Sequence, residues 1–169
     1  METTSGNART LDAEFIEASR VFLRDDYLPK VLHCVGQMSD ADLWWRPNDA
    51  SNSVGNLILH LCGNLRQWIV SSIGGVDFKR DRNAEFAARG PIPKTELVAN
   101  LQQAVREVDG VLAKLEAERL LQRLKIQTYD DVSTLQVVYH VVEHFSYHLG
   151  QILYVYKMKT GTDPRFYNL

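Results

Sequence analysis

The last part of the chain carries one long helical pattern, and this pattern constrains the fold more than any other feature. Over residues 133–159 apolar side chains recur at the three- and four-residue spacing of a single helix face. Ser133 and Gln136 form a capping-box sequence at its start, and Gly161 follows its end. A helix of this kind buries its apolar face against other helices, so the pattern favours a bundle.

Three further segments show the same periodicity. Apolar residues recur at helical spacing over residues 11–35, 53–73 and 94–118. Pro29 interrupts the first segment, so we expect the helix there to kink or to be two pieces, with Gly36 as its stop. The four segments together predict an all-α fold, an antiparallel four-helix bundle with long connectors.

The connectors leave two questions open. The helices can follow one another up-down-up-down, or the chain can make one long crossover between two of them. Residues 76–93 form the longest connector and carry many charges. A solvated crossover with some helical turns is the simpler interpretation, and a lid or binding loop is the alternative. Residues 123–129 are expected to be extended, as a linker or a short strand.

Length and composition indicate one domain over residues 1–169, with residues 1–10 as a loose polar tail. The chain has 169 residues, of which 45% are hydrophobic and 24% charged, as in ordinary globular proteins. The net charge is −2 and basic residues form no dense block, which argues against nucleic-acid binding. Neither a secretory signal nor a membrane-spanning run is visible, so a cytoplasmic location is expected. Cys34 and Cys62 form no metal or redox motif and are expected to be small buried residues.

Four of the five histidines are placed where they can share one site. His140, His144 and His148 are spaced four residues apart on the predicted last helix, so they lie one turn above another. Two imidazoles one turn apart on a helix can bind the same metal ion. His60, in the middle of the second helix, can supply a third ligand from a facing helix. A solvent-facing stripe of histidines is the alternative interpretation.

Polar residues accompany these histidines. Asn56 and Asn64 lie one turn before and after His60, either on a solvated face or in a polar interior around it. Gln151 lies within one turn of His148 and can orient a ligand or a substrate, as can Arg66.

Two segments of the chain resemble the DinB-like (damage-inducible, YfiT-like) metalloenzyme family, which is distinct from the DNA polymerase that shares the DinB name. The first is residues 52–64, with the sequence Asn-Ser-Val-Gly-Asn-Leu-Ile-Leu-His-Leu-Cys-Gly-Asn. The second is residues 140–152, with the sequence His-Val-Val-Glu-His-Phe-Ser-Tyr-His-Leu-Gly-Gln-Ile. The similarity extends over nearly the whole chain through the order and length of the four helices.

The resemblance implies an antiparallel four-helix bundle, often a homodimer, that holds zinc, nickel or a related divalent ion. The family's three ligands correspond to His60, His144 and His148, which leaves His140 at the rim of the site or behind the ligands. Some relatives transfer low-molecular-weight thiols to electrophiles, so a metal-dependent transferase with a small-molecule substrate is the implied function. A metal-dependent hydrolase on the same site and a non-catalytic stress or binding protein with a structural metal are the alternatives.

Overall fold

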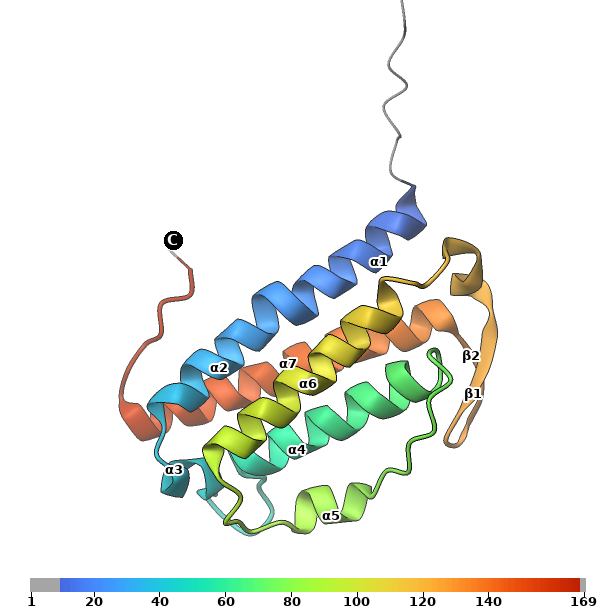
Figure 1. The fold of residues 1–169 in the computed structure, drawn as a ribbon. Coiled ribbons are helices and arrows are strands. Elements are labelled where there is room, and N and C mark those ends of the chain that lie inside the picture. Colours follow the sequence, from blue (N-terminus) through green and yellow to red (C-terminus); the bar gives the residue numbers. More distant parts are fainter. Residues whose placement is uncertain (1–9, 168–169) are drawn as a thin grey trace, which may run out of the picture.

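The computed structural model describes residues 10–167 and shows a helical bundle with one small hairpin (Figure 1). The all-α prediction is therefore confirmed. Residues 1–9, which make up most of the predicted tail, and residues 168–169 lie outside the described residues. None of the helices in residues 10–167 combines the length and the apolar character needed to cross a membrane.

The first long helical rod consists of α1 (Leu11–Val21), a π-helical segment (Phe22–Tyr27) and α2 (Leu28–Gln37). Pro29 neither ends nor divides this rod. The N–H group of Leu28 bonds to the carbonyl of Leu23, five residues back, so the turn before the proline is wider than in an α-helix. A wider turn makes room for the proline ring, which would otherwise meet the carbonyl four residues earlier. The helix also continues through Gly36, the predicted stop, to Gln37.

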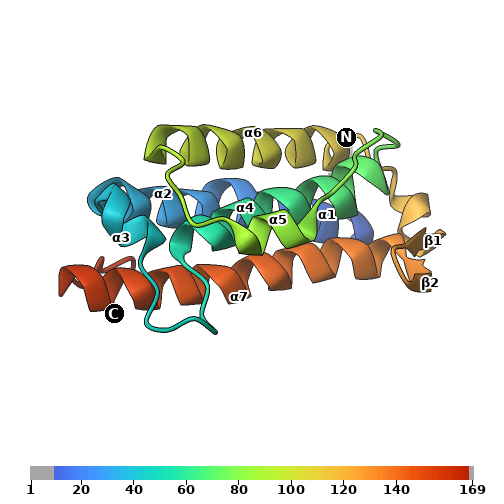
Figure 2. The ribbon, with the colours of Figure 1, turned by 90° about the horizontal axis from the view of Figure 1, so that it is seen from below.

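The second rod consists of α4 (Val54–Leu65) and a π-helical segment (Arg66–Ser71), and it follows the short helix α3 (Asp40–Trp44). Ser53 caps α4, and its side chain exchanges hydrogen bonds with Asn56 in a capping box. The predicted start of this helix is therefore confirmed. Almost every residue of α4 is buried, because α6 and α7 flank it and the crossover lies along its outer side (Figure 2).

The connector between the second and third rods is a long crossover that contains the short helix α5 (Arg82–Ala87). Trp44 fixes its far end, since the indole Nε1 donates a hydrogen bond of 3.4 Å to the carbonyl of Ile92. The indole packs so closely on Gly55 and Gly90 that a Cβ atom at either position would lie about 3 Å from it. Gly90 has a φ of +82°, which further restricts this position to glycine. The tryptophan therefore joins the crossover to the start of α4.

The third rod, α6 (Lys94–Leu112), ends six residues before the predicted end at residue 118. The chain leaves the helix in a turn and a 3₁₀ segment (Ala117–Leu121). Along this path Leu115 and Leu120 are buried in the core. Gly110, a weak helix former, precedes the turn.

A hairpin of β1 (Arg123–Ile126) and β2 (Tyr129–Ser133) leads into the last rod, α7 (Thr134–Thr160). The strand after residue 128 was not predicted. Ser133 and Gln136 form the predicted capping box, and Gly161 ends the helix with a φ of +67°.

Each rod has an antiparallel neighbour: α4 packs against α7, and the α1–α2 rod packs against α6. In Figure 1 the α1–α2 rod and α7 run in one direction, while α4 and α6 run in the other. The crossover makes this order possible, because it returns the chain to the same end of the bundle before α6 begins. The structure thus selects the crossover alternative, and it sets α4 antiparallel to α7, with the middle of each helix in contact.

Candidate metal centre

Three imidazoles from two helices converge inside the bundle. His60 lies in the middle of α4, and His144 and His148 lie on successive turns of the antiparallel α7. The Nε2 atom of His144 is 3.1 Å from Nε2 of His60 and 3.2 Å from Nε2 of His148. Two nitrogens bound tetrahedrally to one zinc ion are roughly 3.3 Å apart. The cluster thus has the spacing of a metal site, and the three side chains offer ligand atoms within 4.8 Å of one another.

The outward-facing nitrogens of two of these rings are held by hydrogen-bond acceptors. Nδ1 of His60 lies 3.0 Å from Oε2 of Glu85, and Nδ1 of His148 lies 2.8 Å from Oε1 of Gln151. An acceptor at Nδ1 places the proton there, so the lone pair of a neutral ring is left on Nε2. Lone pairs facing one another in a buried space are satisfied by a cation, so the donor set fits a divalent metal.

Glu85 is in turn held by Arg80. The Nε and Nη2 atoms of the guanidinium lie 2.6 and 2.7 Å from the two carboxylate oxygens, in the bidentate geometry of a strong ion pair. Nη2 also lies 3.0 Å from Nδ1 of His60 and 3.4 Å from the carbonyl oxygen of His60. In the tautomer that binds a metal through Nε2, the ring proton is on Nδ1 and the imidazole donates to Glu85. The carboxylate therefore accepts from both the arginine and the imidazole, and all three side chains are at most 10% exposed.

The crossover is shaped to bring Glu85 to this point. Asn56 donates from Nδ2 to the carbonyls of Glu85 and Ala88, both at 2.9 Å, and so fixes the backbone of α5 against α4. Gly63 leaves the space that the Arg80–Glu85 pair occupies, since a Cβ atom there would overlap Oε1 of Glu85. Asn56 was predicted near the site as a possible interior residue, and its role is to hold the segment that carries the carboxylate.

Burial in the site favours the neutral form of His144 and His148. Burial, together with the neighbouring rings of His148 and His60, lowers the pKa of His144 to about 3. Burial also lowers the pKa of His148, against the opposing effect of its bond to Gln151. Burial alone would raise the pKa of Glu85, but the hydrogen bonds and charge of Arg80, with His60, hold it below its ordinary value. A buried carboxylate therefore stays ionised beside rings that are ready to bind a cation.

His144 differs from the other two rings in its outward nitrogen. Among residues 10–167, its Nδ1 is the one buried side-chain nitrogen or oxygen without a hydrogen-bond partner. No acceptor thus fixes the orientation of this ring, which is set instead by the contacts with the rings beside it. The ring centroid of His144 lies 4.4 Å from that of His148 and 5.3 Å from that of His140.

The remaining candidates lie around or away from the cluster. His140 is outside the group of three, with 36% of its side chain exposed and its ring 4.3 Å from the ring of Trp68. The sequence placed it at the rim of the site or behind the ligands, and its part in metal binding stays a prediction. Asn64 is buried one turn beyond His60. Arg66 instead pairs with Glu107 on α6 at 2.8 Å, so it takes no part in the cluster. Cys62 is buried and unpaired, and burial raises the pKa of its thiol to about 12.

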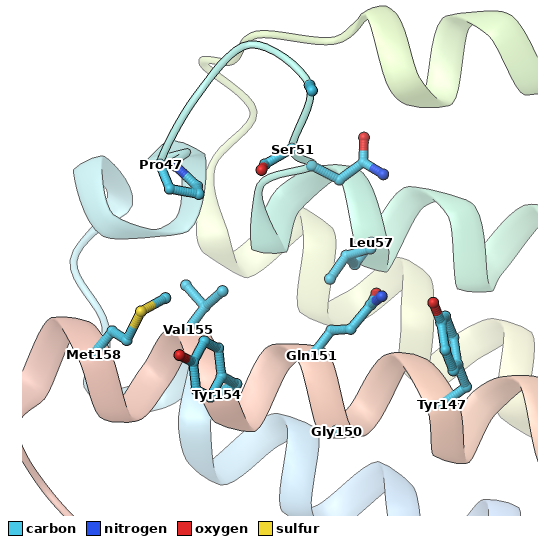
Figure 3. A pocket seen from close by; sticks show the side chains of 11 residues that line it. Pro47, Ser51, Leu57, Tyr147, Gly150, Gln151, Tyr154, Val155 and Met158 are labelled. Atoms are coloured by element: carbon cyan, nitrogen blue, oxygen red, sulfur yellow. The ribbon is translucent and has the colours of Figure 1, made fainter.

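A cavity of about 550 Å³ lies between α7 and the loop before α4, and none of the three histidines lines it (Figure 3). Gln151 and Tyr147 line this cavity and also contact His148, through the 2.8 Å hydrogen bond and through rings 5.1 Å apart. Gln151 and Tyr147 therefore lie between the cavity and His148, with Gln151 on the outward Nδ1 side of the ring.

Sequence reasoning did not single out Glu85 or Arg80. Both lie in the charged crossover, where no periodic pattern indicates which side chains turn inward. Two signals were present in the sequence. Gly63 in the interior of a helix suggests close approach by another segment, and Asp81 can cap a short helix that carries Glu85.

Comparison with known proteins agrees with the fold. No curated protein sequence matches the chain. A solved structure described as a conserved protein from Enterococcus faecalis is similar, with 17% sequence identity and a TM-score of 0.68. The match covers 86% of this chain and 97% of the other, and at this identity it shows the fold alone. A family model described as "Protein of unknown function (DUF1572)" matches residues 9–167. Since that match spans nearly the whole chain, the protein belongs to the DUF1572 family.

Proposed function

We propose that this protein is a DinB-like metalloprotein in which His60, His144 and His148 hold one divalent ion, zinc or nickel. The observation that carries the proposal is the convergence of the three Nε2 atoms, with acceptors on the outward nitrogens of His60 and His148. The Glu85–His60 pair is the carboxylate–histidine arrangement that commonly supports a metal ligand. The predicted homodimer remains a prediction.

The proposed site is open. Within residues 10–167 the group whose ligand atoms lie within 4.8 Å of one another contains three residues, and neither Glu85 nor His140 belongs to it. Structural zinc sites usually have four protein ligands, whereas catalytic sites have three and leave a position for water or substrate. This three-ligand set favours an enzyme over a protein with a structural metal.

The reaction that we propose is transfer of a low-molecular-weight thiol. A divalent ion at this position would lower the pKa of a thiol from about 8.5, so that the thiolate nucleophile is present at neutral pH. The protein's contribution is to keep His144 and His148 neutral, through burial, and to orient His60 through Glu85 and His148 through Gln151. No thiol of the chain competes, because burial raises the pKa of Cys34 and Cys62 to about 11 and 12.

Cobalt substitution tests this proposal. The protein is loaded with Co²⁺ and titrated with 2-mercaptoethanol, and the near-ultraviolet spectrum is followed for a thiolate-to-cobalt charge-transfer band. A saturable band that is missing in His144→Ala supports thiol transfer. A spectrum that responds to pH but not to the thiol would favour the hydrolase over the transferase as the function. A spectrum that responds to neither would show a closed, structural site.

A further inference from the structure

The cavity beside Gln151 and Tyr147 has a lining without charge. It lies between α7 and the loop that precedes α4 (Figure 3). Its neutral polar groups come from Ser51, Asn52, Tyr147, Gln151 and Tyr154, and the rest of the lining is apolar, including Leu57 and Val155. A volume of about 550 Å³ is within the range of sites for small organic molecules.

This lining selects against ions. A charged ligand that leaves water needs an opposite charge or several hydrogen bonds to compensate for the lost solvation. None of the residues that line the cavity carries a charge. A neutral molecule with an apolar or aromatic body loses little solvation here and gains apolar contacts, so the cavity favours an uncharged ligand.

Gln151 determines the polar group that this ligand should carry. Its Oε1 atom is engaged by Nδ1 of His148 at 2.8 Å, which leaves the two amide hydrogens of Nε2. Within the part of the chain that the structure describes, no hydrogen bond engages these hydrogens. The side chain extends from α7 toward Leu57 at the side of the cavity (Figure 3). A carbonyl oxygen on the ligand can accept from this amide.

We propose that the cavity is the binding site of an uncharged small molecule that carries a carbonyl oxygen, held by the amide of Gln151. The inference goes beyond the proposed function, because none of the three histidines lines the cavity and Gln151 contacts His148 at its outward nitrogen. Gln151 is a positioning residue in this account, because one side chain orients both His148 and the ligand. The ligand is thereby held within one side chain's length of a candidate metal ligand.

Binding of a matched pair of probes tests the inference. Benzamide is neutral and has a carbonyl oxygen, while benzoate has the same size and a negative charge. Zinc-loaded protein is titrated with each, and saturation-transfer difference NMR gives the dissociation constants. Benzamide should bind at millimolar concentration and at least tenfold more tightly than benzoate. Absence of benzamide binding, or equal binding of the two probes, would overturn the inference.

Two substitutions of Gln151 separate its two contacts. Gln151→Glu keeps an oxygen for Nδ1 of His148 but removes the amide donor, so zinc content should stay while benzamide binds about tenfold more weakly. Gln151→Leu removes both contacts and should also weaken zinc binding. Unchanged benzamide affinity in Gln151→Glu would contradict the role of the amide. If the wild type takes up no zinc but still binds benzamide through Gln151, the proposed metal function fails while the cavity assignment stands.

Discussion

Replacing Gly63 by alanine should weaken metal binding without touching a metal ligand. A methyl group at this position would overlap Oε1 of Glu85 and lie 2.7 Å from Nε of Arg80, and Cβ atoms essentially never approach other atoms within 3.0 Å. The carboxylate therefore has to retreat by about 1 Å. The 3.0 Å contact between Glu85 and His60 then lengthens to about 4 Å, which is beyond hydrogen-bonding distance.

The expected loss follows from the role of that hydrogen bond. Removing the partner that orients a metal-binding histidine typically costs 10–100-fold in metal affinity, or about 1.4–2.7 kcal/mol. The fold should survive, because alanine favours a helix by up to about 1 kcal/mol over glycine. The atom that the methyl group would meet is at the end of the flexible Glu85 side chain, which can shift while the hydrogen bonds of Asn56 hold the backbone of α5.

The assay is zinc affinity by competition with a chromophoric chelator. Gly110→Ala is the matched control, since it makes the same exchange in a helix where no atom lies within 4 Å of the new methyl group. We expect the control to bind zinc like the wild type and Gly63→Ala to bind 10–100-fold more weakly. Equal affinities in a folded Gly63→Ala protein would refute the role of Glu85.

Two further predictions concern charge in the same cluster. Glu85→Gln places a neutral amide beside the guanidinium of Arg80, whose side chain is 5% exposed. The substitution should lower the free energy of unfolding by about 3 kcal/mol, measured by urea titration. A loss below about 1 kcal/mol would argue against a buried ion pair. The metal-free protein should lose stability in acid, because the pKa of His144 falls from 6.5 to about 3 on folding and the unfolded chain binds the extra proton. The loss of stability begins near pH 6.5 and continues toward pH 3. It amounts to at most about 1.4 kcal/mol per pH unit for this partly exposed ring. Stability that stays constant over this range in both the wild type and His144→Ala would contradict the prediction.

The long helices could be predicted because each carries its own signal in the sequence. For α7, periodic apolar residues, the capping box at Ser133 and the terminal Gly161 all indicate the same boundaries. The early end of α6 had no comparable signal, because Leu115 continues the helical pattern although it reaches the core by another path. The π-helical turn before Pro29 was not predicted either, although the proline indicated an interruption of the helix at this point.

Only the part of the candidate site that lies on the long helices could be predicted from the sequence. The spacing of His144 and His148 indicates one helix face, and the facing position of His60 follows from the bundle. Glu85 reaches the site from a crossover 25 residues further along the chain, through contacts that depend on Asn56 and Gly63. Contacts of this kind depend on the folded path of a loop, which local sequence patterns do not describe.

Metal content, measured by elemental analysis of untagged protein, tests the central claim most directly. The comparison includes His144→Ala, which removes a proposed ligand, and His140→Ala, which removes a histidine one turn away at the rim. We predict about one divalent ion per chain in the wild type and in His140→Ala, and little in His144→Ala. No ion in the wild type, even after zinc or nickel is added, or equal loss in the two variants, would contradict the three-histidine site.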